Sequence, residues 1–397
     1  MTHPTASLTV ATAAQGGPRR GVVRLVLTAF RNYDQLILEL DPAPVVLVGA
    51  NGAGKTNVLE ALSFLAPGRG LRGAGLAEVA NRGSTRPWGV AARLVGPEGG
   101  VDIGTGLTGD GEERRLVHID GRPASGPAAL CEHAAFAWVT PAMDRLFAEG
   151  ATARRRFLDR MALALHPSHG RALSAYERAM RERNALLERA RSADPLWLDA
   201  LEAQMAEQAV AIAAARRELV AGLARHIDTA DDGVFPKARL ALEGVVEGFL
   251  QGMSALAAED AFRARLAAGR QRDAAAGRAL DGAHKTDLIV HHGPKGMPAR
   301  ECSTGEQKAL LIGLVLAHAG LVRDTAGRAP LLLLDEVAAH LDRLRRAALF
   351  ETLAALEAQC WLTGTDATLF EALENSAQFF TVFDGRVIAR SATDHRI

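Results

Sequence analysis

The octapeptide GANGAGKT, residues 49–56, constrains this chain more than any other part of its sequence. It follows VVLV, a short apolar run typical of a buried strand, and it precedes NVLEALSFL, whose apolar residues recur at helical spacing. A strand, a glycine-rich loop and a helix in that order form the context in which such a loop holds phosphate groups. The sequence therefore predicts a P-loop nucleotide-binding fold, with a chance glycine-rich turn as the minor alternative.

Each fixed residue of this loop has a chemical task in holding a nucleoside triphosphate. Gly49 and Gly54 let backbone N–H groups point at phosphate oxygens, and the following helix adds its positive N-terminal end. Lys55 reaches the terminal phosphates, and the hydroxyl of Thr56 is a ligand for Mg²⁺. The loop therefore predicts ATP and Mg²⁺ as cofactors.

A second apolar run, PLLLLDE at 330–336, ends in two adjacent carboxylates. Asp335 is suited to hold Mg²⁺ through water, and Glu336 is suited to polarise the water that attacks the γ-phosphate. A strand that ends in Asp-Glu is by itself more often a helix cap or a solvated loop. Its pairing with a P-loop favours the catalytic interpretation, so Glu336 and Lys55 are the predicted catalytic residues. Thr56 and Asp335 are the predicted metal ligands.

The composition limits which partners and which cellular compartment are expected for this protein. At 397 residues with 48% hydrophobic content the chain can bury a sizeable core, and its 46 basic residues balance 46 acidic ones. No overall positive field therefore attracts nucleic acid or an anionic membrane, and a polyanionic partner needs a local patch. Three cysteines without metal-ligand spacing, Cys131, Cys302 and Cys360, favour a reducing compartment, so the cytoplasm is expected.

No segment of the chain predicts a membrane anchor. No apolar run approaches the roughly 18 residues needed to span a bilayer, since the nearest is broken by Gly, His or Arg. The start of the chain lacks the charged region of a signal peptide, and residues 1–20 are predicted to form a disordered tail.

Nucleotide-binding elements lie at both ends of the chain, with a helical region between them. Short apolar and alternating segments up to residue 150 predict a hairpin, the P-loop strand, a small antiparallel β-layer and a further buried strand at AAFAWVT, residues 134–140. The next 125 or so residues, about 151–275, are rich in Ala, Leu, Arg and Glu and predict a compact helical lobe that is interrupted by the strand-like segment ARLALEG at 238–244. Eight apolar residues at mostly three-or-four spacing predict one long helix in this lobe: Leu198, Leu201, Met205, Ala209, Ile212, Leu219, Leu223 and Ile227. The predicted order is a tail (1–20), the N-terminal half of an ATPase head (21–150), a helical lobe (151–275) and the C-terminal half of the head (276–397).

CSTGEQK, residues 302–308, is the most informative of the remaining segments. Ser303 precedes a predicted helix and can cap it, while Gly305 lets a phosphate approach the backbone. Ser303 and Glu306, three residues apart, also form the pattern of an ordinary capping box. In isolation, the capping box is the favoured interpretation.

The order of the motifs favours the phosphate-binding interpretation over an ordinary capping box. A phosphate-facing helix start shortly before an Asp-Glu strand, followed by AAHLD at 338–342, resembles the ABC-type ATPases with their P-loop, signature motif, acidic strand and dimer loop. The resemblance implies an α/β fold, an ABC-type P-loop ATPase head. Such a head has a mixed sheet with helices plus an antiparallel β-layer, and here it carries an inserted compact helical lobe. An ATP-dependent homodimer is also implied, because in such proteins the signature of one subunit closes on the nucleotide of the other.

Several further segments distinguish among ABC-type ATPases. These are LTAFRNYDQL, NVLEALSFLAPGRGLRG, ARRRFLDR, YERAMRERNALLERA, GAHKTDL and STGEQKALLIGLVLAHA, in this order. Together they resemble the RecF family of bacterial recombination mediators, from about Val22 to the end of the chain. The missing long coiled coil separates the chain from chromosome-organising relatives.

The resemblance to RecF implies a weak DNA-dependent ATPase whose slow hydrolysis acts as a switch. Such proteins dimerise with ATP on double-stranded DNA at gaps and junctions, work with RecR and RecO, and assist RecA loading in recombinational repair and replication restart. The predicted partners are therefore double-stranded and gapped DNA, RecR with RecO, RecA indirectly, and a second copy of the chain, with no membrane.

Matching positions carry the family's site residues onto this sequence. Arg31 and Asn32 match an early pair that lies near the nucleotide, and Asp342 matches the dimer loop. Asp335 and Glu336 match the acidic strand. The P-loop matches are Gly49, Asn51, Gly52, Gly54, Lys55, Thr56 and Asn57, and the signature matches are Ser303, Gly305, Gln307 and Lys308.

The chain departs from the usual pattern within the signature and before it. Thr304 and Glu306 occupy positions that are often Gly and Gln in ABC proteins, and an acidic side chain near a γ-phosphate is expected to slow closure. In VTPAMDRL, Asp144 is displaced from the family's Pro-acidic pattern, so no Q-loop residue is assigned. Ala283 and Lys285 stand where family members usually have Pro and Arg.

The segment CWLTG at 360–364 is not followed by the His that many transporter ATPases use to sense the γ-phosphate. Thr363 or Thr365 is the expected contact in its place. The missing His counts mildly against a transporter subunit.

Contact with DNA requires cations gathered on one surface, since the net charge is zero. The candidates are Arg69, Arg72, Arg82 and Arg86 in the β-layer, and Arg154, Arg155, Arg156 and Arg160 at the start of the lobe. For the cluster at the start of the lobe, a solvated helix face or an intrachain salt-bridge network is an equally good interpretation.

Two other classes of function are weighed against the DNA-bound switch. An ATPase subunit of a membrane transporter would need a groove for a transmembrane subunit and would be insensitive to DNA. A non-enzymatic scaffold would bind nucleotide without turnover. Neither class accounts for the early FRNY and the later RNALL segments.

Overall fold

The computed structural model describes residues 20–108, 114–188 and 194–390. All of the predicted tail except Arg20 lies outside this part of the chain. The chain divides into two compact units, which we call the first unit (Met1–Met143 with Val322–Ile397) and the second unit (Asp144–Leu321). Because this division follows packing alone, the predicted boundaries at residues 150 and 275 remain predictions.

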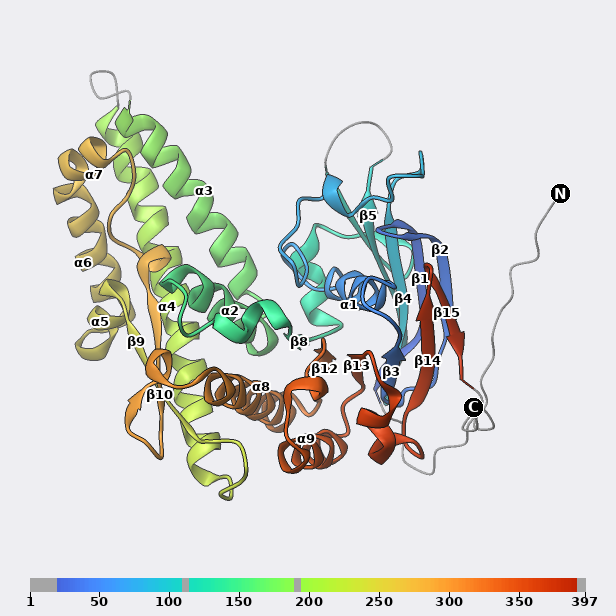
Figure 1. The fold of residues 1–397 in the computed structure, drawn as a ribbon. Coiled ribbons are helices and arrows are strands. Elements are labelled where there is room, and N and C mark those ends of the chain that lie inside the picture. Colours follow the sequence, from blue (N-terminus) through green and yellow to red (C-terminus); the bar gives the residue numbers. More distant parts are fainter. Residues whose placement is uncertain (1–19, 109–113, 189–193, 391–397) are drawn as a thin grey trace. The chain divides into compact units, whose positions relative to one another are not determined.

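A six-stranded sheet in the first unit combines strands from both ends of the sequence (Figure 1). Its strands, in spatial order, are β15 (Arg386–Ala389), β14 (Gln378–Phe383), β3 (Val45–Val48), β13 (Cys360–Gly364), β12 (Leu331–Leu334) and β8 (Phe136–Val139). Every neighbouring pair except β14 with β15 is parallel. The apolar runs VVLV, LLLL and FAWV are buried throughout, which confirms the prediction of buried strands there.

An antiparallel sheet forms the second layer of the first unit. In spatial order it contains β2 (Tyr33–Glu39), β1 (Gly21–Phe30), β4 (Gly89–Gly96), β5 (Gly99–Leu107), β6 (Arg115–Ile119) and β7 (Arg122–Pro123). The predicted hairpin and β-layer are therefore confirmed. Between the layers, helix α1 (Lys55–Ser63) packs against β1 and β13. Phe30, Phe64 and Trp88 meet there with ring centroids 5.3 to 5.9 Å apart.

The remaining elements of the first unit are short, apart from helix α9 (Arg343–Leu356). Asp342 caps this helix, since its carboxylate accepts a hydrogen bond from the backbone N–H of Arg345 at 2.8 Å. Five 3-10 turns complete the connections: η1 (Ala77–Val79), η2 (Pro127–Glu132), η3 (Pro141–Arg145), η6 (Ala338–His340) and η7 (Ala367–Leu373); η3 runs across the boundary between the units.

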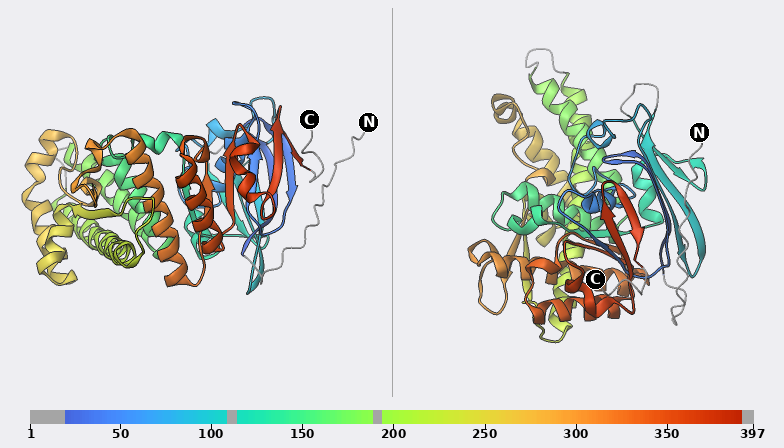
Figure 2. Two further views of the ribbon diagram at one scale, coloured as in Figure 1. Left: turned by 60° about the horizontal axis from the view of Figure 1, so that its bottom comes forward. Right: turned by 45° about the vertical axis from the view of Figure 1, so that its right-hand side comes forward.

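The second unit is mainly helical, as predicted for the lobe. Helices α3 and α4 run side by side in every view (Figures 1 and 2). The predicted apolar stripe of the long helix is buried at all eight positions from Leu198 to Ile227. The helices are α2 (Ala151–Leu165), α3 (His169–Glu188), α4 (Pro195–Thr229), α5 (Val245–Gly252), α6 (Ala255–Ala268), α7 (Arg270–Ala276) and α8 (Thr304–Ala326), which ends in the first unit.

A three-stranded sheet in the second unit was only partly predicted. Strand β9 (Ala238–Glu243) was expected, but its partners β10 (Asp287–His292) and β11 (Met297–Pro298) were not. Both neighbouring pairs are antiparallel, and the turn η4 (Ala283–Lys285) precedes β10. The alternating pattern of β10 is only six residues long, which is too short to be distinguished from a loop by periodicity.

Helix α8 corrects the expectation that no apolar run approaches the length of a membrane span. In the described part of the chain, α8 alone is long and apolar enough, with a window of mean hydropathy 1.5. The charged and polar residues that interrupt it are too few to outweigh the apolar residues in this mean. The window is 61% buried within the protein, as in the core helix of a folded unit, so it gives no argument for a membrane span.

Candidate nucleotide-binding site

The loop GANGAGKT lies at the edge where the parallel strands β3, β13 and β12 end. Gly54 has φ 116° at the start of α1, a conformation that favours glycine, and a Cβ there would lie 2.6 Å from the amide nitrogen of Asn32. A Cβ at Gly49 would lie 2.1 Å from the carbonyl oxygen of Val382. Both fixed glycines of the predicted loop are therefore required by the close packing of the loop against neighbouring segments.

Lys55 is held inside this loop. Its side chain is only 4% exposed, and its ammonium donates hydrogen bonds to the carbonyl oxygens of Gly49 at 2.7 Å and Ala50 at 3.1 Å. The carboxylate of Glu336 lies 3.3 Å from the same nitrogen. A positive charge is thus fixed at the mouth of the loop, where a phosphate group would be bound.

The acidic strand brings its carboxylates to the same place. The hydroxyls of Thr56 and Thr363 each donate to one carboxylate oxygen of Asp335, at 2.9 and 2.8 Å. The backbone N–H of Glu336 donates to the Thr363 hydroxyl at 2.9 Å. Thr363, one of the two residues expected to contact phosphate, therefore links the two acids, whereas Thr365 is exposed.

The backbone of Glu336 and the pKa of Asp335 both depart from their ordinary values. Glu336 has φ 53°, in the left-handed region that non-glycine residues seldom adopt. Such outliers occur where the surrounding structure imposes a functional geometry. Burial raises the pKa of Asp335, and the hydrogen bonds from Thr363 and Thr56 partly offset this effect.

The oxygens beside the loop suit a magnesium ion. Mg²⁺ prefers hard oxygen ligands, and it usually takes one or two from the protein and the rest from phosphates and water. The hydroxyl of Thr56 and the carboxylate of Asp335 lie 2.9 Å apart and are of this kind. The described residues contain no group of three or more His, Cys, Asp or Glu that could hold a metal, and a nucleotide-bound Mg²⁺ requires none.

Glu60 organises the residues that flank the loop, and the sequence analysis did not identify it. Its carboxylate is fully buried and accepts two hydrogen bonds from Arg31, at 2.9 and 2.6 Å, and one from Arg72 at 2.7 Å. Arg72 also donates to Asn57 at 2.8 Å. An acidic residue within the apolar stretch of α1 was the available signal. One carboxylate therefore pairs with two guanidinium groups, and this group of three side chains keeps a formal charge of +1 beside the loop.

Asn32 joins the loop to the helix that follows it. Its amide donates to the carbonyl oxygen of Ala53 at 3.2 Å and accepts from the amide of Asn57 at 2.7 Å. Asn51 and Gly52 lie in the exposed part of the loop. The predicted P-loop residues, the early RN pair and both acids are thus brought together in the first unit.

The predicted signature residues belong to the second unit, at the start of α8. Ser303 and Glu306 form the capping box that the sequence analysis had weighed, with the Ser303 backbone N–H donating to the Glu306 carboxylate at 2.9 Å. Ser303, Thr304 and Gly305 remain exposed. A contact of Ser303 and Gly305 with nucleotide remains a prediction.

Two buried side chains of the signature hold α8 in place. The side-chain amide of Gln307 donates to the carbonyl oxygen of Cys302 at 2.9 Å, so its polar group bonds to its own chain. Lys308 forms an ion pair of 3.1 Å with Asp144, the residue that departs from the family's pattern. These contacts indicate that Gln307 and Lys308 position the helix start.

The arginines proposed for DNA contact differ in how they are used. Arg69, Arg82 and Arg156 are exposed and have no hydrogen-bond or ion-pair partner among the described residues. Arg86 is exposed but pairs with Asp34 at 2.8 Å. The structure thus leaves three of the candidates free to bind a phosphate backbone.

The cluster at the start of α2 is mostly engaged within the chain. Arg154 forms a bidentate ion pair with Asp287, at 2.8 and 2.7 Å, and Arg155 donates to the carbonyl oxygen of Thr286 at 3.0 Å. Burial lowers the pKa of Arg155. The ion pair of Arg154 matches the salt-bridge interpretation, whereas Arg155 is engaged through a backbone carbonyl oxygen.

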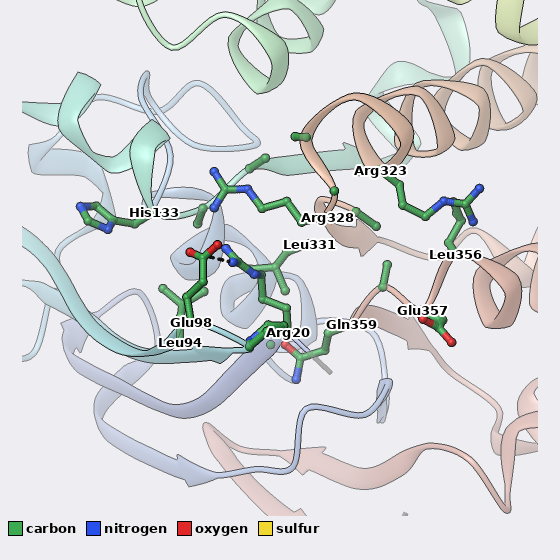
Figure 3. A pocket seen from close by; sticks show the side chains of 18 residues that line it. Arg20, Leu94, Glu98, His133, Arg323, Arg328, Leu331, Leu356, Glu357 and Gln359 are labelled. Carbon is green, nitrogen blue, oxygen red and sulfur yellow. Dashed lines mark hydrogen bonds and ion pairs between the residues drawn. The ribbon is translucent and has the colours of Figure 1, made fainter. Parts of the chain in front are cut away.

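A cavity of about 820 Å³ lies at the opposite edge of the parallel sheet, where β8, β12 and β13 begin (Figure 3). Arg20, Arg323 and Arg328 are among the residues that line it (Figure 3). Each donates to a neighbour: Arg20 to Glu98, Arg328 to the carbonyl of Glu132 and Arg323 to the carbonyl of Ala355. Each of the three therefore has at least one donor engaged within the chain, and the cavity is separate from the P-loop.

Comparison with known proteins agrees with this geometry. A family model described as "AAA domain, putative AbiEii toxin, Type IV TA system" matches residues 45–98, which include the P-loop and α1. A "DNA replication and repair protein RecF" from Mesorhizobium japonicum is 53% identical over 368 residues, covering 92% of this chain and 97% of the relative. The protein of the same name from Brucella suis is 53% identical over 371 residues, covering 93% and 96%.

Solved structures support the fold class. The "recombination mediator protein RecF-ATPrS in RecFOR pathway" matches with a TM-score of 0.82 at 20% identity, covering 94% of this chain and 99% of that one. An Smc head domain from Pyrococcus furiosus matches with a TM-score of 0.51 at 16% identity, covering 94% and 96%. The predicted ABC-type ATPase head is therefore confirmed.

Proposed function

The chain belongs to the RecF family of DNA replication and repair proteins, and from this membership we propose that it is an ATP-dependent clamp on double-stranded DNA. ATP with Mg²⁺ binds at the P-loop and brings two copies together, and slow hydrolysis releases them. The observation that carries this proposal is the convergence of Lys55, Thr56, Asp335 and Glu336 at one edge of the parallel sheet. One cation (Lys55), two candidate metal ligands (Thr56 and Asp335) and one candidate base (Glu336) meet there.

The residues divide the chemistry as follows. Lys55 and the backbone N–H groups of the loop bind phosphate oxygens, and Thr56 and Asp335 hold Mg²⁺, which when bound neutralises phosphate charge. The carboxylate of Glu336 accepts a proton from the attacking water. Glu336 pairs with Lys55 at 3.3 Å, so phosphate binding by Lys55 and proton transfer to Glu336 are linked. When the lysine turns to a phosphate, it leaves the Glu336 carboxylate available as a base.

Replacing Glu336 by Gln is expected to lower ATP turnover about tenfold to a hundredfold, because an amide cannot accept the proton. Since the proposed turnover is already slow, this loss lies at the low end of general-base effects. ATP binding should persist, and the dimer should live longer. Single-turnover hydrolysis and sedimentation with ATP measure the two effects.

The matched control for this prediction is Glu357→Gln. Glu357 also has φ 53° in the first unit, but it is exposed at the end of α9. Normal turnover in the Glu336→Gln variant would show that another group is the base.

The DNA surface rests on exposed arginines, because the net charge of the chain is zero. For the double variant Arg69→Ala with Arg82→Ala we expect duplex DNA affinity to fall about threefold to tenfold at low salt. The salt dependence of binding should also become shallower. The control is Arg24→Ala with Arg93→Ala, two arginines on the strands β1 and β4 that pair with Glu39 and Asp102, whereas Arg69 and Arg82 lie in the connection between α1 and β4. Equal losses in both double variants would reject the proposed surface.

The cellular role follows from the family. We propose gapped DNA as the preferred site, RecR with RecO as partners, assistance to RecA loading, and the cytoplasm as the location. One solved relative is named a recombination mediator in the RecFOR pathway. The transporter alternative finds no support among the relatives reported above.

The test is ATP hydrolysis and sedimentation of the protein with and without gapped duplex DNA. An ATP-dependent dimer whose slow hydrolysis rises with DNA is the expected result. Indifference to DNA in both assays would favour the transporter interpretation. Nucleotide binding without turnover, even with DNA, would favour a scaffold.

A further inference from the structure

The signature segment contains an ion pair that its sequence does not announce. Glu306, in the first turn of α8, pairs through one carboxylate oxygen with the ammonium of Lys295. Its other carboxylate oxygen accepts hydrogen bonds from the backbone N–H and the hydroxyl of Ser303, both at 2.9 Å. The Ser303 hydroxyl and a lysine ammonium are therefore joined through a single carboxylate.

This arrangement keeps Glu306 negatively charged. The ion pair with Lys295 and the two hydrogen bonds from Ser303 lower the pKa of Glu306 to about 2. A permanent negative charge thus lies at the helix start that carries the proposed signature. Without a cation beside it, that charge would oppose the approach of a triphosphate, which is the reason why an acidic side chain near a γ-phosphate is expected to slow closure.

Lys295 is presented by a fixed turn between two paired strands. His292 pairs with Met297 across the antiparallel β10 and β11. The backbone N–H of Gly296 donates to the carbonyl oxygen of His292 at 2.8 Å, and Gly296 has φ 64°, which favours glycine at this place. This hairpin turn therefore places the ammonium of Lys295 beside Glu306, although the hairpin and helix α8 are separate elements.

We propose that Lys295 is the compensating cation of the signature motif. By pairing with Glu306, it cancels the charge that would repel the triphosphate held by a second copy, and it keeps the Ser303 hydroxyl close to a neutral pair. Lys295 is a positioning residue, since it acts through Glu306. This inference depends on the ATP-dependent dimer proposed above.

A surface ion pair without functional consequence is the competing explanation. The side chains of Lys295 and Glu306 are 49% and 26% exposed, and pairs of this kind contribute little to stability. The two explanations differ in what removal of the lysine does to dimer formation. They do not differ in what it does to unfolding.

The experiment compares Lys295→Met, Glu306→Gln, the double variant and Lys295→Arg with the unaltered protein. Sedimentation velocity measures the ATP concentration at which half of the protein is dimeric, at low and at high salt. Lys295→Met should raise this concentration about fivefold to tenfold at low salt, and less at high salt, because the effect is electrostatic. The double variant should return to within about twofold of Glu306→Gln, and Lys295→Arg should resemble the unaltered protein.

Binding of a fluorescent ATP analogue to the dilute monomer is the second readout. It should be unchanged in Lys295→Met, because the P-loop belongs to the first unit and Lys295 to the second. Unaltered dimerisation of Lys295→Met would overturn the inference, and so would a double variant as weak as Lys295→Met. If the unaltered protein forms no dimer with ATP, the proposed function fails and the inference falls with it.

Discussion

Replacing Lys55 by Met is expected to weaken ATP binding by at least about 100-fold and to abolish ATP-dependent dimerisation. The methionine keeps most of the length of this side chain, which is 4% exposed, but removes the ammonium, which lies within hydrogen-bond distance of two loop carbonyls. Charge-assisted hydrogen bonds contribute about 1.5 to 3 kcal/mol each, so losing two of them to a phosphate gives an effect of this size. Titration with a fluorescent ATP analogue and light scattering with ATP measure it.

The same variant reports on Glu336. Without Lys55 this carboxylate has lost the cation 3.3 Å away, and its negative charge faces the position of the triphosphate. Adding Glu336→Gln to Lys55→Met should therefore recover a small part of the lost affinity. Dimerisation that survives in Lys55→Met would contradict the role assigned to this lysine.

Lys237→Met is the matched control. Lys237 lies in the second unit and pairs with the exposed Asp232 at 3.0 Å. The substitution removes the same charge from a surface position. ATP binding and dimerisation should be unchanged.

Local patterns predicted the parts of the site that are contiguous in sequence. The loop 49–56 and the acids Asp335 and Glu336 each follow a buried strand, and parallel strands bring their carboxyl ends to one edge of the sheet. Thr56 therefore meets Asp335 although 279 positions separate them. That meeting could be predicted because each residue is fixed by its own strand.

Contacts between loops could not be predicted in this way. Arg31 meets Glu60 only because the turn after β1 packs over α1, and neither residue belongs to a periodic pattern. Lys295 meets Glu306 only because β10 and β11 pair, and those strands were not predicted. Ser303 and Glu306 form the capping box, and the signature interpretation of Ser303 and Gly305 stays a prediction.

In the helical lobe, too, periodicity predicted a helix but not the contacts between elements. A long apolar stripe predicted α4 because helical spacing persists over many turns. Buried charges within the lobe leave no such periodic trace. In the apolar interior around α4, Arg183 and Arg216 are nearly inaccessible, and their partners come from other helices.

Replacing Arg183 by Met is expected to lower the free energy of unfolding of the second unit by about 3 to 5 kcal/mol. Its guanidinium donates to Glu202, Asp273 and the carbonyl oxygen of Leu266, each at 2.8 Å, and all of these groups are buried. The methionine fills similar volume but leaves two buried carboxylates without this cation. Chemical denaturation followed by helical circular dichroism measures the loss, and adding Asp273→Asn should recover part of it because one of the two buried carboxylates that lost this cation is removed. Arg181→Met on the same helix removes only an exposed pair with Glu177, so its unfolding should be nearly unchanged. Equal stability of the two arginine variants would mean that the buried carboxylates take up protons or water instead of remaining charged in the interior.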